Sequence, residues 1–398
     1  MSRNAEAGRG PLHGVRVIEI ESIGPGPFVG MMLADMGADV VRVERPGPDP
    51  SAAASTDPSL RSRRSIVLDL KCADALPVLM RLIKSSDVLI EGFRPGVAER
   101  LGFGPEACAR ENSRLVYGRI TGWGQTGPLA KVAGHDINYL SLTGILHQIG
   151  TPGGKPVVPL NAIADFGAGG MLLAYGVMCA LFERERSGKG QVVDAAMIDG
   201  VLAFMAAYIG LQSAGLWRDE TGTNFLAGGA HFYDTYQTGD GKWVAVGAIE
   251  PQFHALLLRK LGLAPEEFSA GEGYGDRSSY GHRVQTIWPA LKLKMAEAIR
   301  RFTRAELEAM FDGVDACLTP VLGMNEAASH PHNVVRRSFI TVGGIVQNAP
   351  APRFSRSAPA QPCAPRPPGS DTREVLAEAG YSDADFERIR ALGVFGSA

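Results

Sequence analysis

The stretch GVRVIEIESIGPGPFVGMMLADMGADVVRVE, residues 14–44, decides the fold class of this sequence. Residues 14–20 alternate between apolar and other side chains as a strand does, and residues 23–27 form a turn of glycine and proline. A helix-like apolar run over 28–36 and a second strand at 39–44 follow. Strand, turn, helix and strand in this order make a βαβ unit, which requires a parallel sheet. We therefore expect an α/β fold.

The same pattern continues over the first 200 residues or so, which predicts a doubly wound sheet. Further elements are expected as strands that end at 69–71 and span 87–91, 115–120 and 191–197, and as helices that span 76–83 and 166–186. Later, Gly239-Asp240-Gly241 separates two strand-like runs, which indicates a hairpin. The mostly helical pattern of 251–311 differs from the first part and predicts a second domain.

Composition and charge exclude several classes of function. The chain has 398 residues and a formal net charge of −2, so nucleic acid and anionic membranes are not expected partners. Its 5 cysteines are scattered and form no CxxC pair, which predicts reduced thiols and a cytoplasmic protein. The amino-terminal residues lack the apolar core of a secretion signal. Polar residues interrupt the apolar runs before about 18 residues, so no membrane span is expected.

The glycines of the first turn are typical of dinucleotide sites, but their spacing does not fit one. Gly24, Gly26 and Gly30 depart from the G-x-G-x-x-G pattern. Pro25 and Pro27 also remove backbone donors that a pyrophosphate would need. A tight turn that enters a helix is the simpler interpretation, and a nicotinamide cofactor is not expected.

Three residues are candidates for proton transfer. His135 lies in GHDINY (134–139), after a glycine-rich loop and before a helix-like run. Asp165 precedes a long apolar helix, and Glu250 precedes Pro251 at a second helix start. Each has an ordinary interpretation, as a structural histidine, an N-cap and a helix-start residue. Together they provide two bases, His135 and Asp165, and a carboxylate, Glu250, that can orient the imidazole.

Four motifs together give the sequence a family resemblance: TGWGQTGP (121–128), GHDINY, DFGAGG (165–170) and AVGAIEPQF (245–253). With them the chain resembles the α-methylacyl-CoA racemases of the family III (CaiB/BaiF) CoA-transferase superfamily, over nearly its whole length. The resemblance implies an interlocked homodimer with a Rossmann-like large domain and a smaller α+β domain. It implies boundaries at 1–215 for the large domain, 225–325 for the small one, and 326–398 for a segment that returns to the large domain.

The resemblance also implies a reaction. These enzymes epimerise the α-carbon of 2-methyl-branched acyl-CoA thioesters by moving a proton through an enolate. His135 and Asp165 match the bases on opposite faces, and Glu250 matches the carboxylate that pairs with the histidine across the dimer. CoA is part of the substrate, and no metal or other cofactor is implied. The matched CoA contacts are Arg45, Leu68, Asp69, Leu70, Lys71, Gly92, Phe93, Arg94, Pro95, Arg100, Gly134, Asp136, Ile137, Asn138 and Tyr139.

Two features of the site are expected from the chemistry. The amides at the helix start, 165–167, are candidate donors to the enolate oxygen. Residues 169–171 and 197–205, rich in glycine and methionine, are candidates for an apolar surface under the acyl chain or for ordinary core.

Two other functions stay open. A CoA-transferase of the same superfamily would use Asp165 as a nucleophile, and a non-catalytic acyl-CoA-binding protein would bind the thioester without proton exchange. The glycine-rich run Ser269–Ser279 matches none of the family's motifs.

Overall fold

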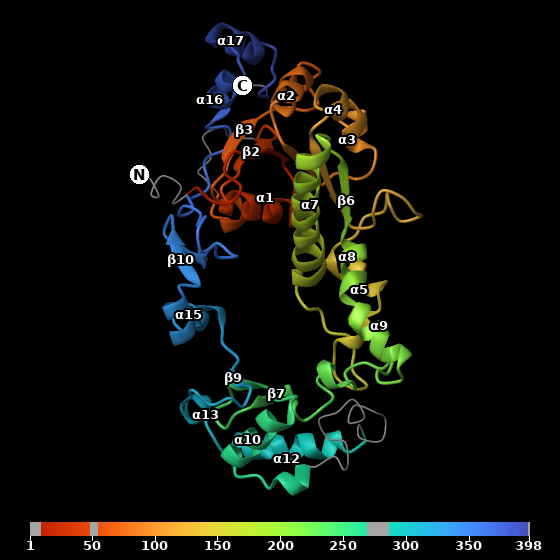
Figure 1. The fold of residues 1–398 in the computed structure, drawn as a ribbon, viewed down its shortest axis with the longest axis vertical. Coiled ribbons are helices and arrows are strands. Elements are labelled where there is room, and N and C mark those ends of the chain that lie inside the picture. The colour runs from red at the N-terminus through yellow and green to blue at the C-terminus, as the bar shows by residue number, and fades with distance from the viewer. Residues whose placement is uncertain (1–8, 48–54, 269–285, 397–398) are drawn as a thin grey trace. The chain divides into compact units, whose positions relative to one another are not determined.

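The computed structural model describes residues 9–47, 55–268 and 286–396 (Figure 1). The chain divides into two compact units. Unit 1 comprises Met1–Tyr139, Leu160–Ala203 and Val334–Ala398, and unit 2 comprises Leu140–Pro159 and Phe204–Asn333. The residues after 333 thus share a unit with the amino-terminal part of the chain.

Unit 1 is built on a six-stranded sheet in the order β3-β2-β1-β4-β5-β6. Its strands are β1 (Arg16–Ile20), β2 (Asp39–Glu44), β3 (Arg64–Val67), β4 (Val88–Glu91), β5 (Val116–Thr121) and β6 (Val192–Ala196). All neighbouring pairs are parallel. The order reverses between β1 and β4, as it does in doubly wound folds. The prediction of an α/β fold with a parallel sheet is confirmed.

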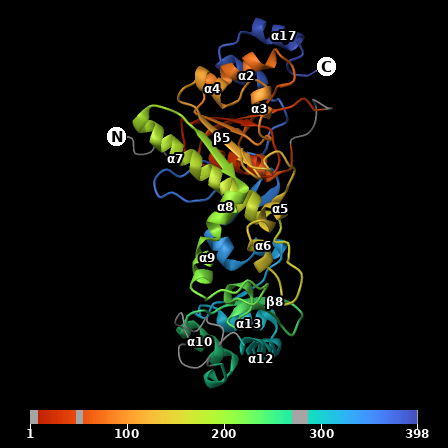
Figure 2. The ribbon, with the colours of Figure 1, turned by 90° about the vertical axis from the view of Figure 1, so that its right-hand side faces the viewer.

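Helices cover both faces of this sheet (Figure 2). The helical segments of unit 1 are α1 (Pro25–Asp35), η1 (Pro58–Leu60), α2 (Ala75–Lys84), α3 (Val97–Arg100), α4 (Pro105–Glu111), η2 (Ala162–Gly170), α7 (Met171–Ser187), α8 (Met197–Phe204), α16 (Thr372–Glu378) and α17 (Asp383–Ala391). One apolar core joins the sheet to α2, α4, α16 and α17. On the other side α1 contacts β1, β2 and β4, and α7 contacts β5 and β6. The chain also forms a hairpin of β10 (Phe339–Val342) and β11 (Ile345–Asn348), and α5 (Asp136–Ser141) and α15 (Pro331–Arg336) lie at the unit boundaries.

Three predicted elements of unit 1 have boundaries that differ from the expected ones. Helix α1 begins at Pro25 and not at Phe28, because prolines are tolerated in a first turn whose amides have no helical partner. Strand β3 ends at Val67, before the predicted 69–71. The long helix begins at Ala162, and its first nine residues, Ala162–Gly170, are π-helical. Asp165 therefore lies inside a helix and is not an N-cap.

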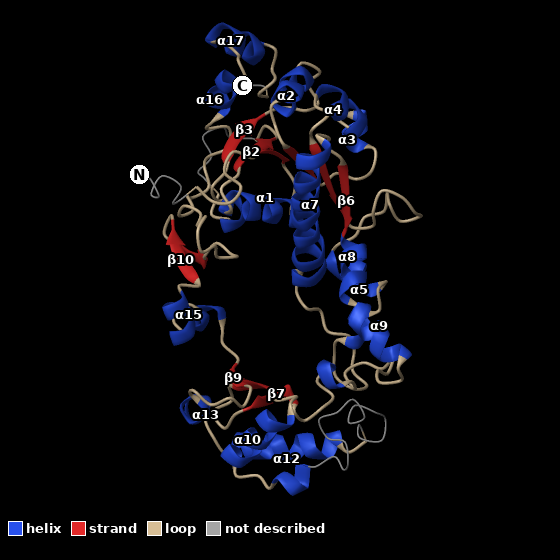
Figure 3. Cartoon of the chain, viewed as in Figure 1, coloured by secondary structure: helices blue, strands red, loops and turns tan. Residues whose placement is uncertain are grey.

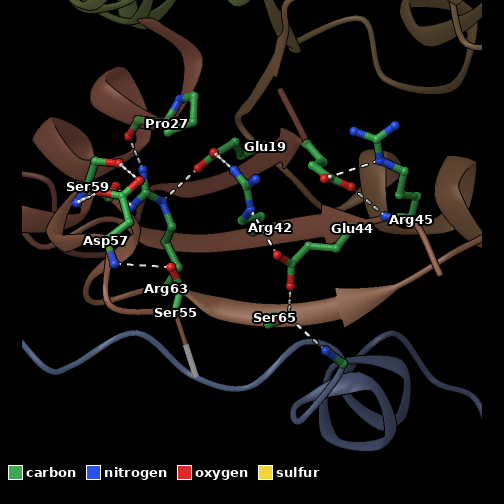
Figure 4. A network of polar contacts seen from close by, with 12 residues as sticks. Glu19, Pro27, Arg42, Glu44, Arg45, Ser55, Asp57, Ser59, Arg63 and Ser65 are labelled. Carbon is green, nitrogen blue, oxygen red and sulfur yellow. Dashed lines mark hydrogen bonds and ion pairs between the residues drawn. The ribbon is translucent and has the colours of Figure 1, made fainter. Parts of the chain in front are cut away.

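Buried ion pairs tie α1 to the sheet (Figure 4). The Glu19 carboxylate on β1 lies 2.5 Å from the Arg42 guanidinium and 2.7 Å from that of Arg63, and its side chain has no exposed surface. Arg63 also donates to the carbonyl oxygen of Pro27 in the first turn of α1. The hydroxyl of Ser65 on β3 donates to the carboxylate of Glu44 on β2. This network fixes the amino-terminal turn of α1, where Gly24 and Pro25 stand.

Unit 2 is a small α+β unit (Figure 3). Strands β7 (Tyr233–Gln237), β8 (Trp243–Gly247) and β9 (Leu318–Pro320) form an antiparallel sheet, which confirms the predicted hairpin. Helices α10 (Pro251–Leu261), α12 (Trp288–Arg300) and α13 (Arg304–Phe311) share one apolar core with it. The unit also holds α6 (Ile145–Gln148), α9 (Ala206–Ser213), η3 (Phe225–Ala227), η4 (Pro265–Phe268) and α14 (Met324–Ala327). The run Ser269–Ser279 lies outside the described residues.

One helix, Ala162–Ser187, is long and apolar enough to cross a membrane by length and composition alone. Asp165 and Glu183 interrupt the apolar run of this helix, and the absence of a membrane span stays a prediction. Core helices of globular proteins meet the same criterion, and this helix packs against β5 and β6 through Leu173, Val177 and Ala180. The criterion is thus weak evidence for a membrane span here.

Candidate active site

A pocket of ≈ 480 Å³ opens at the carboxyl edge of the unit 1 sheet. Residues 22–25 after β1, 92–95 after β4 and 120–123 at the end of β5 form one part of its wall. Ala130 and residues 132–135 form another, and Tyr139, Asn161, Asp165 and Met197 complete it. The pocket therefore lies beside the reversal of strand order between β1 and β4, where doubly wound folds bind their ligands.

His135 lies in this wall at the junction predicted from the sequence. It immediately precedes α5, and its backbone N–H donates to the Oδ1 of Asn138 over 3.0 Å. The residue is exposed, so its imidazole is accessible to a ligand. The GHDINY turn thus presents a solvent-accessible base at the pocket.

Asp165 lies in the same wall, half-buried on the π-helical turn η2. The Nδ2 of Asn161 donates to its Oδ2 over 3.2 Å. Burial raises the pKa of the Asp165 carboxyl and the neighbouring Asp136 carboxylate raises it further, while Asn161 and His135 oppose these effects. A raised pKa makes a carboxyl a better proton carrier than an ordinary, fully ionised aspartate. The structure therefore brings two acid–base groups, His135 and Asp165, to one pocket.

Asp136 has a different environment from its neighbour in the sequence. Its side chain is buried, with 3% of its surface exposed, and its Oδ2 accepts the backbone N–H groups of Ala164 (2.7 Å) and Asp165 (2.8 Å). The Asp165 amide, predicted as a donor to the enolate oxygen, is therefore already engaged. Asp136 is not part of the pocket wall.

Two aromatic residues support the GHDINY turn. The Tyr139 ring meets Trp123 edge to face, with 4.8 Å between centroids, and its hydroxyl donates to the carbonyl oxygen of Gly134. Burial raises the pKa of Tyr139 to about 12. A Cβ added to Gly134 would lie 2.8 Å from the Tyr139 ring, so only glycine fits this packing.

The predicted CoA contacts fall into two groups. Those in the pocket wall are Gly92, Phe93, Arg94, Pro95, Gly134 and Tyr139. Glu91 stabilises the loop of residues 92–95 after β4. Its carboxylate accepts hydrogen bonds from the Phe93 N–H (2.7 Å) and from Arg119 (2.9 Å). The residues outside the wall are Arg45, Leu68, Asp69, Leu70, Lys71, Arg100, Asp136, Ile137 and Asn138.

Several cations of the second group nevertheless share the edge of the sheet on which the pocket opens. Arg45 follows β2, Lys71 lies in the turn between β3 and α2, and Arg100 ends α3 beyond the β4 loop. The Arg45 side chain is 77% exposed and lies 3.3 Å from Glu21. Strands β2 and β3 are parallel to β1 and β4, so Arg45 and Lys71 follow strands that end at the edge of the sheet on which the pocket opens.

The remaining predicted contacts have less accessible side chains or different roles. Leu68 is fully buried in the core, and Leu70 packs against the same core, so only the backbone of Leu68 can face a ligand. Asp69 donates its N–H to the carbonyl oxygen of Val394 over 2.7 Å. Ile137 is 38% exposed on α5.

Glu250 belongs to unit 2, where it is the N-cap residue of α10 and is exposed. Its carboxylate makes no capping hydrogen bond to the helix, so it is available for another partner. The pairing of Glu250 with His135 remains a prediction. Among the described residues no cluster of three or more His, Cys, Asp or Glu side chains has the arrangement of a metal site.

Ser22, Trp123 and Asn161 are among the residues of the pocket wall that the sequence analysis did not select as site residues. The hydroxyl of Ser22 is buried without a hydrogen-bond partner in the described structure. Its position just after the first strand was a usable signal, because ligands of doubly wound sheets bind at the carboxyl ends of strands. Asn161 contacts Asp165 across one helical turn, and no spacing rule would have singled it out.

Comparison with known proteins identifies the family of this chain. Residues 12–372 match the model of CoA-transferase family III. The chain is 47% identical to the α-methylacyl-CoA racemase of Mus musculus and 45% identical to that of Homo sapiens, in each case over 96% of both chains. Its fold is similar to the crystal structure of a CAIB/BAIF family protein from Brucella suis (TM-score 0.76, 26% identity, 93% of this chain and 100% of that one). The chain belongs to CoA-transferase family III.

Proposed function

We propose that this protein is an α-methylacyl-CoA racemase, which epimerises the α-carbon of 2-methyl-branched acyl-CoA thioesters. The observation that carries the proposal is the presence of His135 and Asp165 in the wall of one pocket. The high identity to two racemases over nearly the whole chain supports the same reaction.

The reaction requires a base on each face of the α-carbon. One of His135 and Asp165 removes the weakly acidic α-proton, and the other returns a proton to the opposite face of the enolate. The raised pKa of Asp165 favours this role, because the carboxyl must be ionised in one direction and protonated in the other. No oxidation state changes, so the chemistry requires no redox cofactor, and CoA is part of the substrate.

The acyl chain and the nucleotide need different surfaces. Met197 lines the pocket, and a Cβ on Gly169 would lie 2.6 Å from its Cγ; glycine thus makes room for this apolar side chain. We assign the acyl chain to this surface. The CoA phosphates are assigned to Arg94 in the pocket wall and to Arg45, Lys71 and Arg100, because cationic side chains, guanidinium groups above all, bind phosphate oxygens well.

The proposal includes a homodimer and a cytoplasmic location. Helix α7 exposes Met171, Tyr175, Met178 and Phe182, which recur at helical spacing along one side. Such an apolar stripe fits burial against a second copy of the chain. In the dimer, Glu250 of the partner subunit would orient the His135 imidazole.

The rival function within the family is CoA transfer, in which Asp165 would attack the thioester. Non-catalytic binding of acyl-CoA is the third possibility. His135 beside the pocket favours the racemase, because transfer through an aspartyl adduct needs no second base on the opposite face.

Proton NMR of (S)-2-methylacyl-CoA in D2O tests the proposal, with wild type beside His135→Ala. We expect the α-proton signal to disappear while the epimers equalise, and both changes to stop in the variant. Transfer of CoA to an added carboxylic acid without exchange would instead identify a transferase. Binding with neither reaction would identify a non-catalytic protein for this class of thioester.

A further inference from the structure

We propose that Asp136 is a positioning residue, whose buried carboxylate fixes the π-helical turn that carries Asp165 to the loop that carries His135. The kinetic part of this inference rests on the proposed function. The structural part rests on the contacts of Asp136 alone.

The first observation is where the Asp136 carboxylate lies and what it binds. It is almost completely buried, and in the described part of the chain no Lys, Arg or His forms an ion pair with it. Its Oδ2 accepts two backbone amides, and its Oδ1 is buried without a hydrogen-bond partner there. Burying a carboxylate without a cation is costly. The two amide bonds are the interactions that stabilise it.

The second observation is that these amides open the helix of Asp165. The first amides of a helix have no partner within it and need an acceptor from elsewhere. The local candidate, Asn161, makes no side-chain cap and instead donates to the Asp165 carboxylate. The acceptor comes from Asp136, 28 residues earlier. The helix start is thereby attached to the segment that begins with His135.

The third observation is that the rest of the turn has little freedom to move. A Cβ on Gly169 would lie 2.6 Å from the Cγ of Met197, and one on Gly170 would lie 2.6 Å from the Cδ1 of Phe28. Neighbouring side chains therefore pack directly against the backbone of the turn. Asp136 binds the amides at the amino-terminal end of the turn, so both ends of the turn are fixed.

Precise placement matters for a reaction with two bases. Misplacement of a reacting group by about 1 Å can lower a rate about 100-fold. Asp136 lies next to His135 in the chain and binds the amide of Asp165 itself. It thus links both bases without lying in the pocket wall, so it acts through them and not on the substrate.

Hydrogen exchange tests the structural part in the full-length protein. In Asp136→Ala the amides of residues 164 and 165 should lose protection, whereas Asp136→Asn keeps an acceptor oxygen and should preserve it. Asp199→Asn, at an exposed aspartate of unit 1, is the matched control. Unchanged protection of both amides in Asp136→Ala would overturn the inference.

Kinetics test the consequence for catalysis. We expect Asp136→Ala to lower kcat of α-proton exchange about 100-fold with little change in KM, and Asp136→Asn to stay within about 10-fold of wild type. The asparagine should also move the acidic limb of the rate profile to lower pH, because a carboxylate that acts on Asp165 is removed. His135 and Asp136 are the ionisable neighbours that shift the pKa of Asp165. Asp165 and Arg94 in turn shift the pKa of Tyr139, in opposite directions.

The outcomes separate the two proposals. If wild type exchanges no α-proton, the proposed function fails, and amide protection still decides the role of Asp136. If wild type is active and Asp136→Ala matches its kcat, the positioning role is wrong. Should the alanine variant not fold, an Asp136→Asn variant with the wild-type pH profile would overturn the inference.

Discussion

Two buried histidines make unit 2 sensitive to acid. His231 and His254 are 0% and 3% exposed, and their rings meet edge to face with 5.1 Å between centroids. Burial, and to a smaller extent His254, lowers the pKa of His231 to about 3, and burial lowers that of His254 to about 4. Both rings are therefore neutral in the folded protein at every pH above about 4.

The sign and size of the effect follow from linkage. The folded pKa values lie below the unfolded value of about 6.5, so these residues contribute full stability above that value and lose it as the pH falls. A pH of about 5 lies about 1.5 units below the pKa of an unfolded histidine. At about 1.36 kcal/mol per unit, protonation there stabilises the unfolded state by about 2 kcal/mol for each histidine. Acidification from about pH 7.5 to about pH 5 should thus destabilise unit 2 by about 4 kcal/mol through the pair.

Urea unfolding followed by tryptophan fluorescence measures this loss, because Trp217, Trp243 and Trp288 of the 4 tryptophans lie in unit 2. The double variant His231→Phe/His254→Leu should have a nearly flat dependence over the same pH range. His332→Gln, which changes an exposed histidine of the same unit, should keep the wild-type dependence. A double variant that loses as much free energy of unfolding as wild type would refute the reasoning.

Three further changes have defined outcomes. Glu19→Gln removes the carboxylate that pairs with the buried guanidinium of Arg63, while Arg42 keeps its second partner, Glu44. The change should lower the free energy of unfolding by about 3–5 kcal/mol in urea titration. Gly24→Ala forces a side chain into φ 70°, ψ −116°, and a loss of about 1–3 kcal/mol is expected by the same measurement. Arg94→Gln should raise KM for the CoA thioester about 10-fold while kcat changes little, since one charge-assisted contact contributes about 1.5–3 kcal/mol; an unchanged KM would exclude Arg94 from CoA binding.

The parallel sheet was predictable because its signal is local. Strands β1, β2, β4, β5 and β6 are apolar runs bounded by turn residues, and each was predicted to within about two residues, the usual uncertainty of boundaries. The start of α1 was missed because proline was interpreted as a turn residue, although it is equally suited to a first helical turn. The π-helical turn Ala162–Gly170 was not predictable, because its acceptor comes from a distant segment.

The candidate site was only partly accessible from the sequence for the same reason. Motifs selected His135 and Asp165. Their presence in one pocket depends on the contact of η2, which carries Asp165, with β5, which precedes the loop of His135. Leu68 was selected by resemblance, whereas its side chain lies in the core. Ser22 was missed because a serine in a turn has many ordinary roles.

The environment of Asp165 bears on the choice between racemisation and CoA transfer. A nucleophilic carboxylate must be ionised, and a nearby cation or several donors would lower its pKa and favour that state. Here the largest effect is burial, the adjacent carboxylate of Asp136 acts in the same direction, and the Asn161 donor and His135 only oppose them. The net result is a raised pKa, which makes the protonated form more accessible than it is for an ordinary aspartate. A group that must both take and give a proton benefits from such an environment, whereas a nucleophile does not.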